Sequence, residues 1–132
     1  MSSSLLAVQK AVYELLTGDA ELMAMITGVF DHVPKGQAFP YVRIGEATEV
    51  PWNDFGRPGS QLTINVHAFD NAAEVARLLG IGTAVQGITD GADPTIIGSS
   101  LVDIAFEFNQ VLYDSDSATN HMAMRFRVFI ER

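Results

Sequence analysis

Apolar residues recur along this chain at two different spacings, and each spacing predicts its own kind of element. Near the N-terminus the spacing is helical, with Lys10 and Glu14 on the opposite side. We therefore predict a helix over about residues 4–17, closed by Gly18, and a short second helix capped by Asp19. The two apolar stripes consist of Leu5, Val8, Val12, Leu15 and Leu16, followed by Leu22, Met25 and Ile26.

Strict alternation of apolar and polar residues farther along predicts strands. The clearest are residues 61–69, 101–112 and 119–131, and shorter ones are expected at 29–33 and 41–44. Only a short acidic turn separates the last two strands, which therefore pair antiparallel.

A third helix is expected between the strands, over residues 72–86. Asn71 would cap it, and Glu74 can bond back to that cap. Gly80 and Gly82 indicate either a close helix–sheet approach or an early end of the helix. Its buried side is predicted to consist of Val75, Leu78, Leu79 and Val85.

The order of elements predicts one α+β domain over residues 1–132. One-sided strands favour a mainly antiparallel sheet of four to five strands with helices packed on one face. We expect the strand residues Leu62, Ile64, Val66, Phe106, Phe108, Met124, Phe126 and Val128 to be buried against Leu5, Val12, Leu15, Val75 and Leu79.

A segment rich in proline and glycine, residues 49–60, is predicted to be a long irregular loop. It carries two large aromatic residues, Trp52 and Phe55. Exposed aromatics on loops commonly anchor partners. The alternative is that both fold back over the core.

Composition narrows the possible functions. The chain has 132 residues, 48% of them hydrophobic, and no cysteine, which excludes a disulfide framework, thiolate metal sites and cysteine nucleophiles. No apolar run is long enough to span a membrane, and the N-terminus lacks the basic region of a signal peptide, so we expect a cytoplasmic protein. The net charge is −8 and the basic residues are scattered, which disfavours specific binding of nucleic acid.

Candidate chemistry is sparse. Four polar residues could share the exposed face of the sheet and form a metal or acid–base site, or could simply be solvated: His67, Asp103, Glu107 and His121. Asp114 and Asp116 resemble half of a calcium loop, but the glycine and the distant glutamate of such a loop are missing. We interpret them as a solvated hairpin tip and predict no catalytic residue, metal or cofactor.

Several segments together resemble the tail-completion family of long-tailed bacteriophages, also called tail terminators or tail-to-head joining proteins. The resemblance covers nearly the whole chain. It rests on Leu15-Leu16-x-x-Asp19 with Leu22, Val29-Phe30-Asp31-x-x-Pro34, Phe39-Pro40-Tyr41-Val42-x-Ile44-Gly45, the strand 62–69 running into the helix 72–86, and the closing strand, acidic hairpin and strand.

The resemblance implies a non-enzymatic virion protein that forms a hexameric ring on the finished tail tube. Expected partners are copies of itself, the tail tube protein and the head-completion or connector protein, while DNA passes through without specific binding. It implies assembly in the host cytoplasm and a final place at the tail–head interface.

The residue types then suggest where contacts form. Charged and aromatic residues expected at assembly contacts are Glu49, Trp52, Asp54, Phe55, Arg57, Asp103, Glu107, Arg125 and Arg127, and acidic residues that could face DNA are Asp114 and Asp116. Two alternatives remain: a small-ligand or metal-dependent enzyme that uses the polar sheet face around His67 and Glu107, or another head-closure or minor tail protein.

Overall fold

A computed structural model describes residues 4–53 and 56–131. In chain order the elements are α1 (Ser4–Thr17), α2 (Ala20–Met25), β1 (Val29–Phe30), β2 (Tyr41–Pro51), β3 (Gly59–Asp70), α3 (Ala76–Thr89), β4 (Ser100–Asp114) and β5 (Thr119–Glu131). The predicted α+β class is confirmed. Within the described ranges, no helix is both long and apolar enough to cross a membrane.

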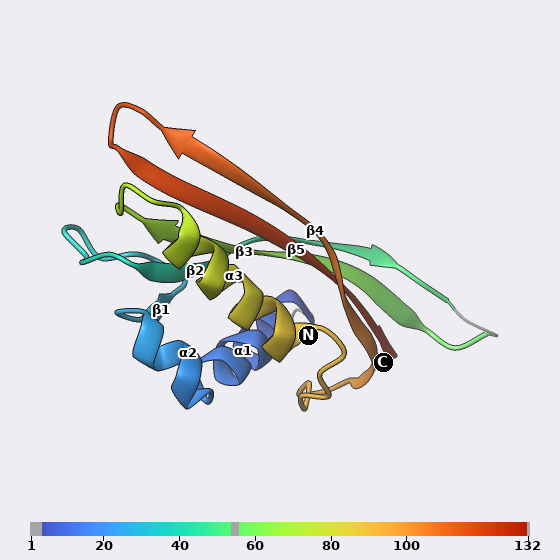
Figure 1. Ribbon diagram of the computed structural model, residues 1–132. Helices are drawn as coiled ribbons and strands as arrows, with labels where there is room; N and C mark the ends of the chain where they lie inside the picture. The colour runs from blue at the N-terminus through green and yellow to red at the C-terminus, as the bar shows by residue number, and fades with distance from the viewer. Residues whose placement is uncertain (1–3, 54–55, 132) are drawn as a thin grey trace.

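The five strands form one twisted sheet in the order β1-β2-β3-β5-β4. Every neighbouring pair is antiparallel except β1 and β2, which are parallel. All three helices lie on one side of this sheet, and its other face is open (Figure 1). The predicted arrangement of helices on one face of a mainly antiparallel sheet is therefore confirmed.

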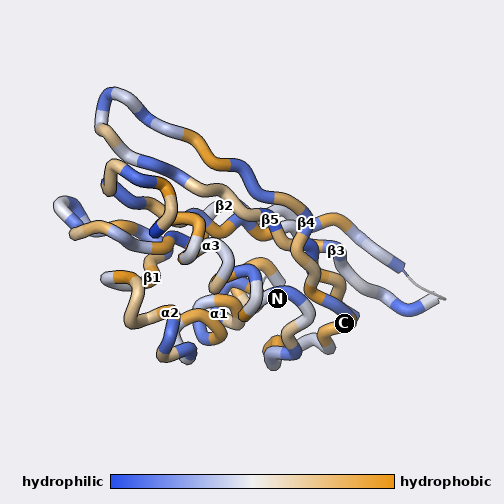
Figure 2. Tube along the Cα trace, viewed as in Figure 1, coloured by the Kyte–Doolittle hydropathy of each residue, from blue (hydrophilic) through white to orange (hydrophobic). Residues whose placement is uncertain are grey.

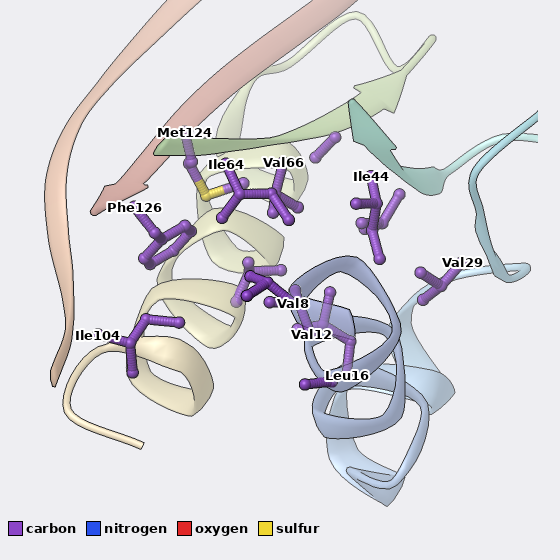
Figure 3. Packing of buried hydrophobic residues seen from close by; sticks show 14 of the residues in the cluster. Val8, Val12, Leu16, Val29, Ile44, Ile64, Val66, Ile104, Met124 and Phe126 are labelled. Atoms are coloured by element: carbon purple, nitrogen blue, oxygen red, sulfur yellow. The ribbon is translucent and has the colours of Figure 1, made fainter. Parts of the chain in front are cut away.

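The core lies between that covered face and the helices. Ile64 and Val66 of β3 and Phe126 of β5 point toward the helices, where α1 presents Val8 and Val12 (Figure 3). Alternate residues of β5 from Met122 to Ile130 are buried, as the period of two requires. Of the predicted core, the fully buried members are Leu62, Ile64, Val66, Met124, Phe126, Val128 and Val12, while Leu5, Leu15 and Phe106 are partly buried.

The third helix begins at Ala76 rather than at residue 72. The predicted cap at Asn71 is wrong, because the N-cap position is Val75, which makes no side-chain cap bond. In the turn before the helix, Asp70 Oδ1 accepts hydrogen bonds from the N–H groups of Asn71 and Ala72. Val75 lies before the helix and is exposed, and Leu79 is also exposed instead of buried. Their places in the core are taken by Leu78, Ile81 and Val85, which are fully buried.

The sequence allowed either a close helix–sheet approach or an early helix end at Gly80 and Gly82, and the structure shows the close approach at Gly82. A Cβ at this position would collide with the sulfur of Met122 on β5. The helix therefore continues past both glycines to Thr89 and lies directly on β5.

The prediction that Phe106 and Phe108 share one face is wrong. The pairing of β4 with β5 shifts register between these two residues, as it does between Leu101 and Asp103. A bulge of this kind inserts one extra residue and sends the following side chains to the other face. Phe106 consequently packs edge-on against Phe126, while Phe108 is 39% exposed.

The predicted loop 49–60 is too long at both ends, because β2 extends to Pro51 and β3 begins at Gly59, and the two strands pair as far as Pro51 and Ser60. Trp52 N donates to Gly59 O at 3.0 Å. Backbone N–H groups alternate in direction along a strand, so the nitrogen of Pro51 points away from β3. Proline is tolerated there because no partner strand requires its missing hydrogen.

Candidate assembly surfaces

The outer edge of β4 is the first exposed apolar surface. The turn after α3 covers the beginning of this edge: Gly91 N donates to Ile104 O at 2.8 Å, and Phe106 N donates to Asp90 Oδ1 at 2.9 Å. Within the described ranges, no strand pairs with the edge beyond that point, and residues 107–114 are all exposed. The apolar members are Phe108, Val111, Leu112 and Tyr113.

Sequence reasoning missed this surface, although one signal was present. Val111, Leu112 and Tyr113 are three consecutive apolar residues, which breaks the alternation of a one-sided strand. Figure 2 shows the resulting hydrophobic stretch on the β4–β5 hairpin, away from the helices. An exposed apolar edge strand of this length is a template for pairing with another chain.

The second surface is a groove at the opposite edge of the sheet. A hollow of about 420 Å³ lies between α1 and β1 and is lined in part by Leu6, Tyr13, Val29 and Phe30. Leu6 is 66% exposed and Tyr13 is 43% exposed. Lys10 and Asp31 also line it, so that the groove carries one charge of each sign.

Three of the residues predicted for assembly contacts meet on the open face. Glu107 Oε1 lies 3.0 Å from Arg127 Nη2 and 3.9 Å from Arg125 Nη1. The Arg125 guanidinium also lies 4.5 Å from the centre of the Phe108 ring. These charges are paired within one chain, and Asp103, exposed opposite Phe129, lies farther along β4.

Two of the residues predicted at the β2–β3 end, Trp52 and Arg57, contact side chains of β5. Trp52 is half-buried, with its ring 4.9 Å from that of Phe129. Arg57 Nη1 lies 3.3 Å from Glu131 Oε2 in a pair that is exposed on the arginine side. Glu49 is half-buried opposite Leu62. Asp54 and Phe55 lie outside the described residues.

The acidic turn between β4 and β5 is fully exposed from Asp114 to Ala118. Asp114 Oδ1 accepts a hydrogen bond from Asp116 N at 3.0 Å. A hydrogen bond from Ser117, followed by that from Asp116, lowers the pKa of Asp114. The carboxylate therefore organises the turn itself.

Two histidines and a glutamate form a separate cluster on the open face. His67 Nε2 lies 3.1 Å from Glu46 Oε2, and His67 Nδ1 lies 2.6 Å from His121 Nε2. Burial raises the pKa of Glu46, but hydrogen bonds from His67 and Asn65 outweigh it and lower the pKa to about 2. An ionised Glu46 only accepts, so His67 donates to it from Nε2.

The environment keeps His121 neutral. Burial lowers the pKa of His121, and the neighbouring His67 and Arg43 act in the same direction. Its ring stacks on Phe69, with centres 4.4 Å apart. Among the described residues, no three His, Asp or Glu side chains are grouped so that they could hold a metal ion.

A family profile described as "Tail completion protein gp17" matches residues 10–131 of this chain. This protein belongs to the tail completion family. It is 27% identical over 124 residues to tail completion protein gp17 of Bacillus phage SPP1, a match that covers 94% of this chain and 92% of the relative. The resemblance that the sequence suggested is therefore confirmed.

Two solved structures extend this relationship to three dimensions. A chain in the virion of a native gene transfer agent particle superposes with a TM-score of 0.90 at 27% identity, and both chains are covered over their full length. The structure of bacteriophage SPP1 gp17 gives a TM-score of 0.63 at 26% identity, with 92% of this chain and 87% of the other covered. This tail completion protein is accordingly a structural component of a phage-type tail.

Proposed function

We propose that this protein assembles into a hexameric ring on the head-proximal end of the tail tube, terminates the tail and joins it to the head connector. The observation that carries the proposal is the match of residues 10–131 to the tail completion family. The full-length likeness to a chain in the virion of a gene transfer agent supports it.

The shape of the subunit suits a joint with two ends. The β2–β3 turn lies level with the C-terminal end of β5, and the β4–β5 turn lies level with the end of β3. The two hairpins consequently protrude at opposite ends of the sheet (Figure 1). One end can contact the tail tube protein while the other contacts the head-completion or connector protein.

Charge is consistent with DNA passing through such a ring. The net charge of −8 per subunit provides no cationic patch with which to release counterions from phosphate. We assign Asp114 and Asp116, exposed at the β4–β5 turn, as residues that face the passing DNA. Duplex DNA should then slide through without adsorbing.

The proposal is tested by deleting the protein from the producing phage or particle and restoring it from a plasmid. Without it, electron microscopy should show heads and tails that are not joined, or tails of abnormal length. Restoring the wild-type protein should recover complete particles. Normal joined particles in its absence would overturn the proposed function.

The predicted contacts at the β2–β3 end are tested by replacing Trp52 and Phe55 together with alanine. The double variant should remain folded, because Trp52 packs on the open face and not in the core. It should nevertheless support fewer joined particles. Particle yield equal to that of wild type would remove these two residues from the assembly contacts.

A further inference from the structure

We propose that the exposed part of β4, residues 107–114, lies against β1 of the next subunit, in the groove between α1 and β1. This inference rests on the proposed ring and deepens it, because it names the surfaces by which successive copies meet. The two surfaces are different and lie on opposite edges of one sheet, so a single molecule cannot satisfy both. Contacts of this head-to-tail kind generate rings when the rotation closes.

The register of the sheet places the two surfaces at the same level. Val111 lies opposite Met122, which lies opposite Ala68. Ala68 in turn lies opposite Val42, which lies opposite Val29 of β1. A row drawn straight across the sheet therefore joins Val111 on one edge to Val29 on the other.

This level matters because a closed ring allows rotation but no translation along its axis. Suppose that the ring axis runs nearly parallel to the strands and that the sheet of one copy continues into the sheet of the next. Val111 of one copy then lies beside Val29 of its neighbour. The next row brings Gln110 beside Phe30. Continuing the register by one residue past the end of β1 would bring Asn109 beside Asp31. No shift along the strands is needed, so the contact is compatible with closure.

Strand direction and chemistry also fit. Because β1 is parallel to β2 while β4 runs opposite to β2, the two edges meet antiparallel, the more stable mode of pairing. The incoming strand supplies Val111 and Tyr113 on the helix side, where the groove offers Leu6 and Tyr13, while Leu112 lies on the open face opposite His121. The contact would cover two exposed apolar surfaces at once, and would pair backbone groups on the edge of β4.

Cysteine cross-linking tests the contact directly, since the chain contains no cysteine. Asp31→Cys combined with Asn109→Cys places two exposed residues in one predicted row, at a separation that a disulfide can bridge. Oxidised particles that carry this variant should yield a ladder of linked subunits on a non-reducing gel. The control, Asp31→Cys with Asp103→Cys, puts the second cysteine on the same strand but far from that row and should remain monomeric.

Particles that contain the double-cysteine variant but show no ladder would overturn the edge contact, and so would equal cross-linking in the control. Either result would leave the proposed function standing, because the particles themselves would be complete. Loss of the function is detected separately, by the deletion experiment above.

A second variant pair covers the case in which the cysteine variants are not incorporated. Val111 is 40% exposed on the helix side of β4, and Leu79 is 41% exposed on α3, away from both surfaces. Val111→Lys should lower the yield of joined particles by about tenfold or more, as expected for loss of an interface hot spot, whereas Leu79→Lys should preserve it. Both variants should keep the wild-type melting temperature, and equal particle yields would overturn the inference.

Discussion

β4 and β5 pair along almost their whole length, yet they differ sharply in burial. On β5, buried and half-buried residues alternate from Met122 to Glu131. On β4, only Ile104 is buried, and every residue from Glu107 onward is exposed. The two strands occupy different places, because β5 lies between two strands under α3 while β4 is the edge strand.

The difference teaches that apolar residues on a strand do not by themselves show that a helix covers it. β5 carries its apolar residues to fill the core of its own chain. The end of β4 carries comparable residues that stay exposed in the described part of the chain. Such a surplus in a protein of a virion tail points to burial by a neighbouring chain.

The largest contrast should come from truncating one phenylalanine on each strand. Phe126→Ala removes a fully buried ring of β5 and should lower the free energy of unfolding by about 3 to 5 kcal/mol. Phe108→Ala removes a ring that contacts Arg125 on the open face and should cost only about 1 kcal/mol or less. Denaturant melts of the isolated subunit compare them, and similar losses would contradict the distinction.

The next largest effect on stability should come from Asp70, which links the end of β3 to α3. Asp70 is fully buried at the end of β3, binds two backbone N–H groups and pairs with Arg77 of α3. Asp70→Ala removes the acceptor of these hydrogen bonds and should cost about 1 to 3 kcal/mol, measured by denaturant melts. Asp70→Asn keeps one acceptor oxygen and should cost less.

The same carboxylate should contribute to acid sensitivity. Its hydrogen bond from Arg77 is the main cause that lowers the pKa of Asp70 in the folded protein. Its contribution is therefore complete above the ordinary aspartate pKa and is lost as pH falls through the lowered value. In Asp70→Asn the decline in stability below about pH 4 should be shallower, and an unchanged decline would contradict the assignment.

Alanine substitutions at two glycines of α3 should change stability less, and in opposite directions, because Gly82 faces β5 and Gly87 does not. In Gly82→Ala the new methyl group meets Met122 of β5, and the net cost should be roughly 1 kcal/mol after alanine's better helix propensity is included. A Cβ at Gly87 meets nothing within 4 Å, so Gly87→Ala should stabilise the protein by up to about 1 kcal/mol. Melting temperatures that move in the same direction would contradict the close approach.

The smallest effect lies on the open face of β5. Because the pKa of His121 is lowered on folding, the unfolded chain binds a proton more readily than the folded one. Stability should therefore decrease as pH falls below about 6.5, the ordinary histidine pKa. His121→Phe preserves a ring against Phe69 and should reduce the difference between melting temperatures at pH 7 and pH 5. An equal difference in both proteins would show that another group is responsible.

Sequence reasoning succeeded where one chain's own burial dictates the pattern. The first helix and the last strand were predicted with the bounds that the structure has, because each places one apolar face on the core. It failed at the start of α3, which begins at Ala76 without a side-chain cap, and along β4, where a bulge turns Phe108 to the open face. Bulges and edge positions depend on the neighbouring strand, which local spacing does not reveal.

The site was predicted only in part for the same reason. Glu107 does meet Arg125 and Arg127, since these residues lie on adjacent strands of one face. The partnership of His67 with Glu46 was missed, because it depends on the register between β2 and β3. The groove between α1 and β1 was missed because it joins segments that are far apart in the sequence.

The length of β4 has a consequence for the architecture of the joint. Its 15 residues span about 50 Å, whereas the 14 residues of α1 span only about 21 Å. The strands, and not the helices, therefore set the distance between the two ends of the subunit. Inserting two residues within such a strand would lengthen it by about 7 Å and keep its faces, whereas inserting one turns the following side chains over, as the bulges in β4 do.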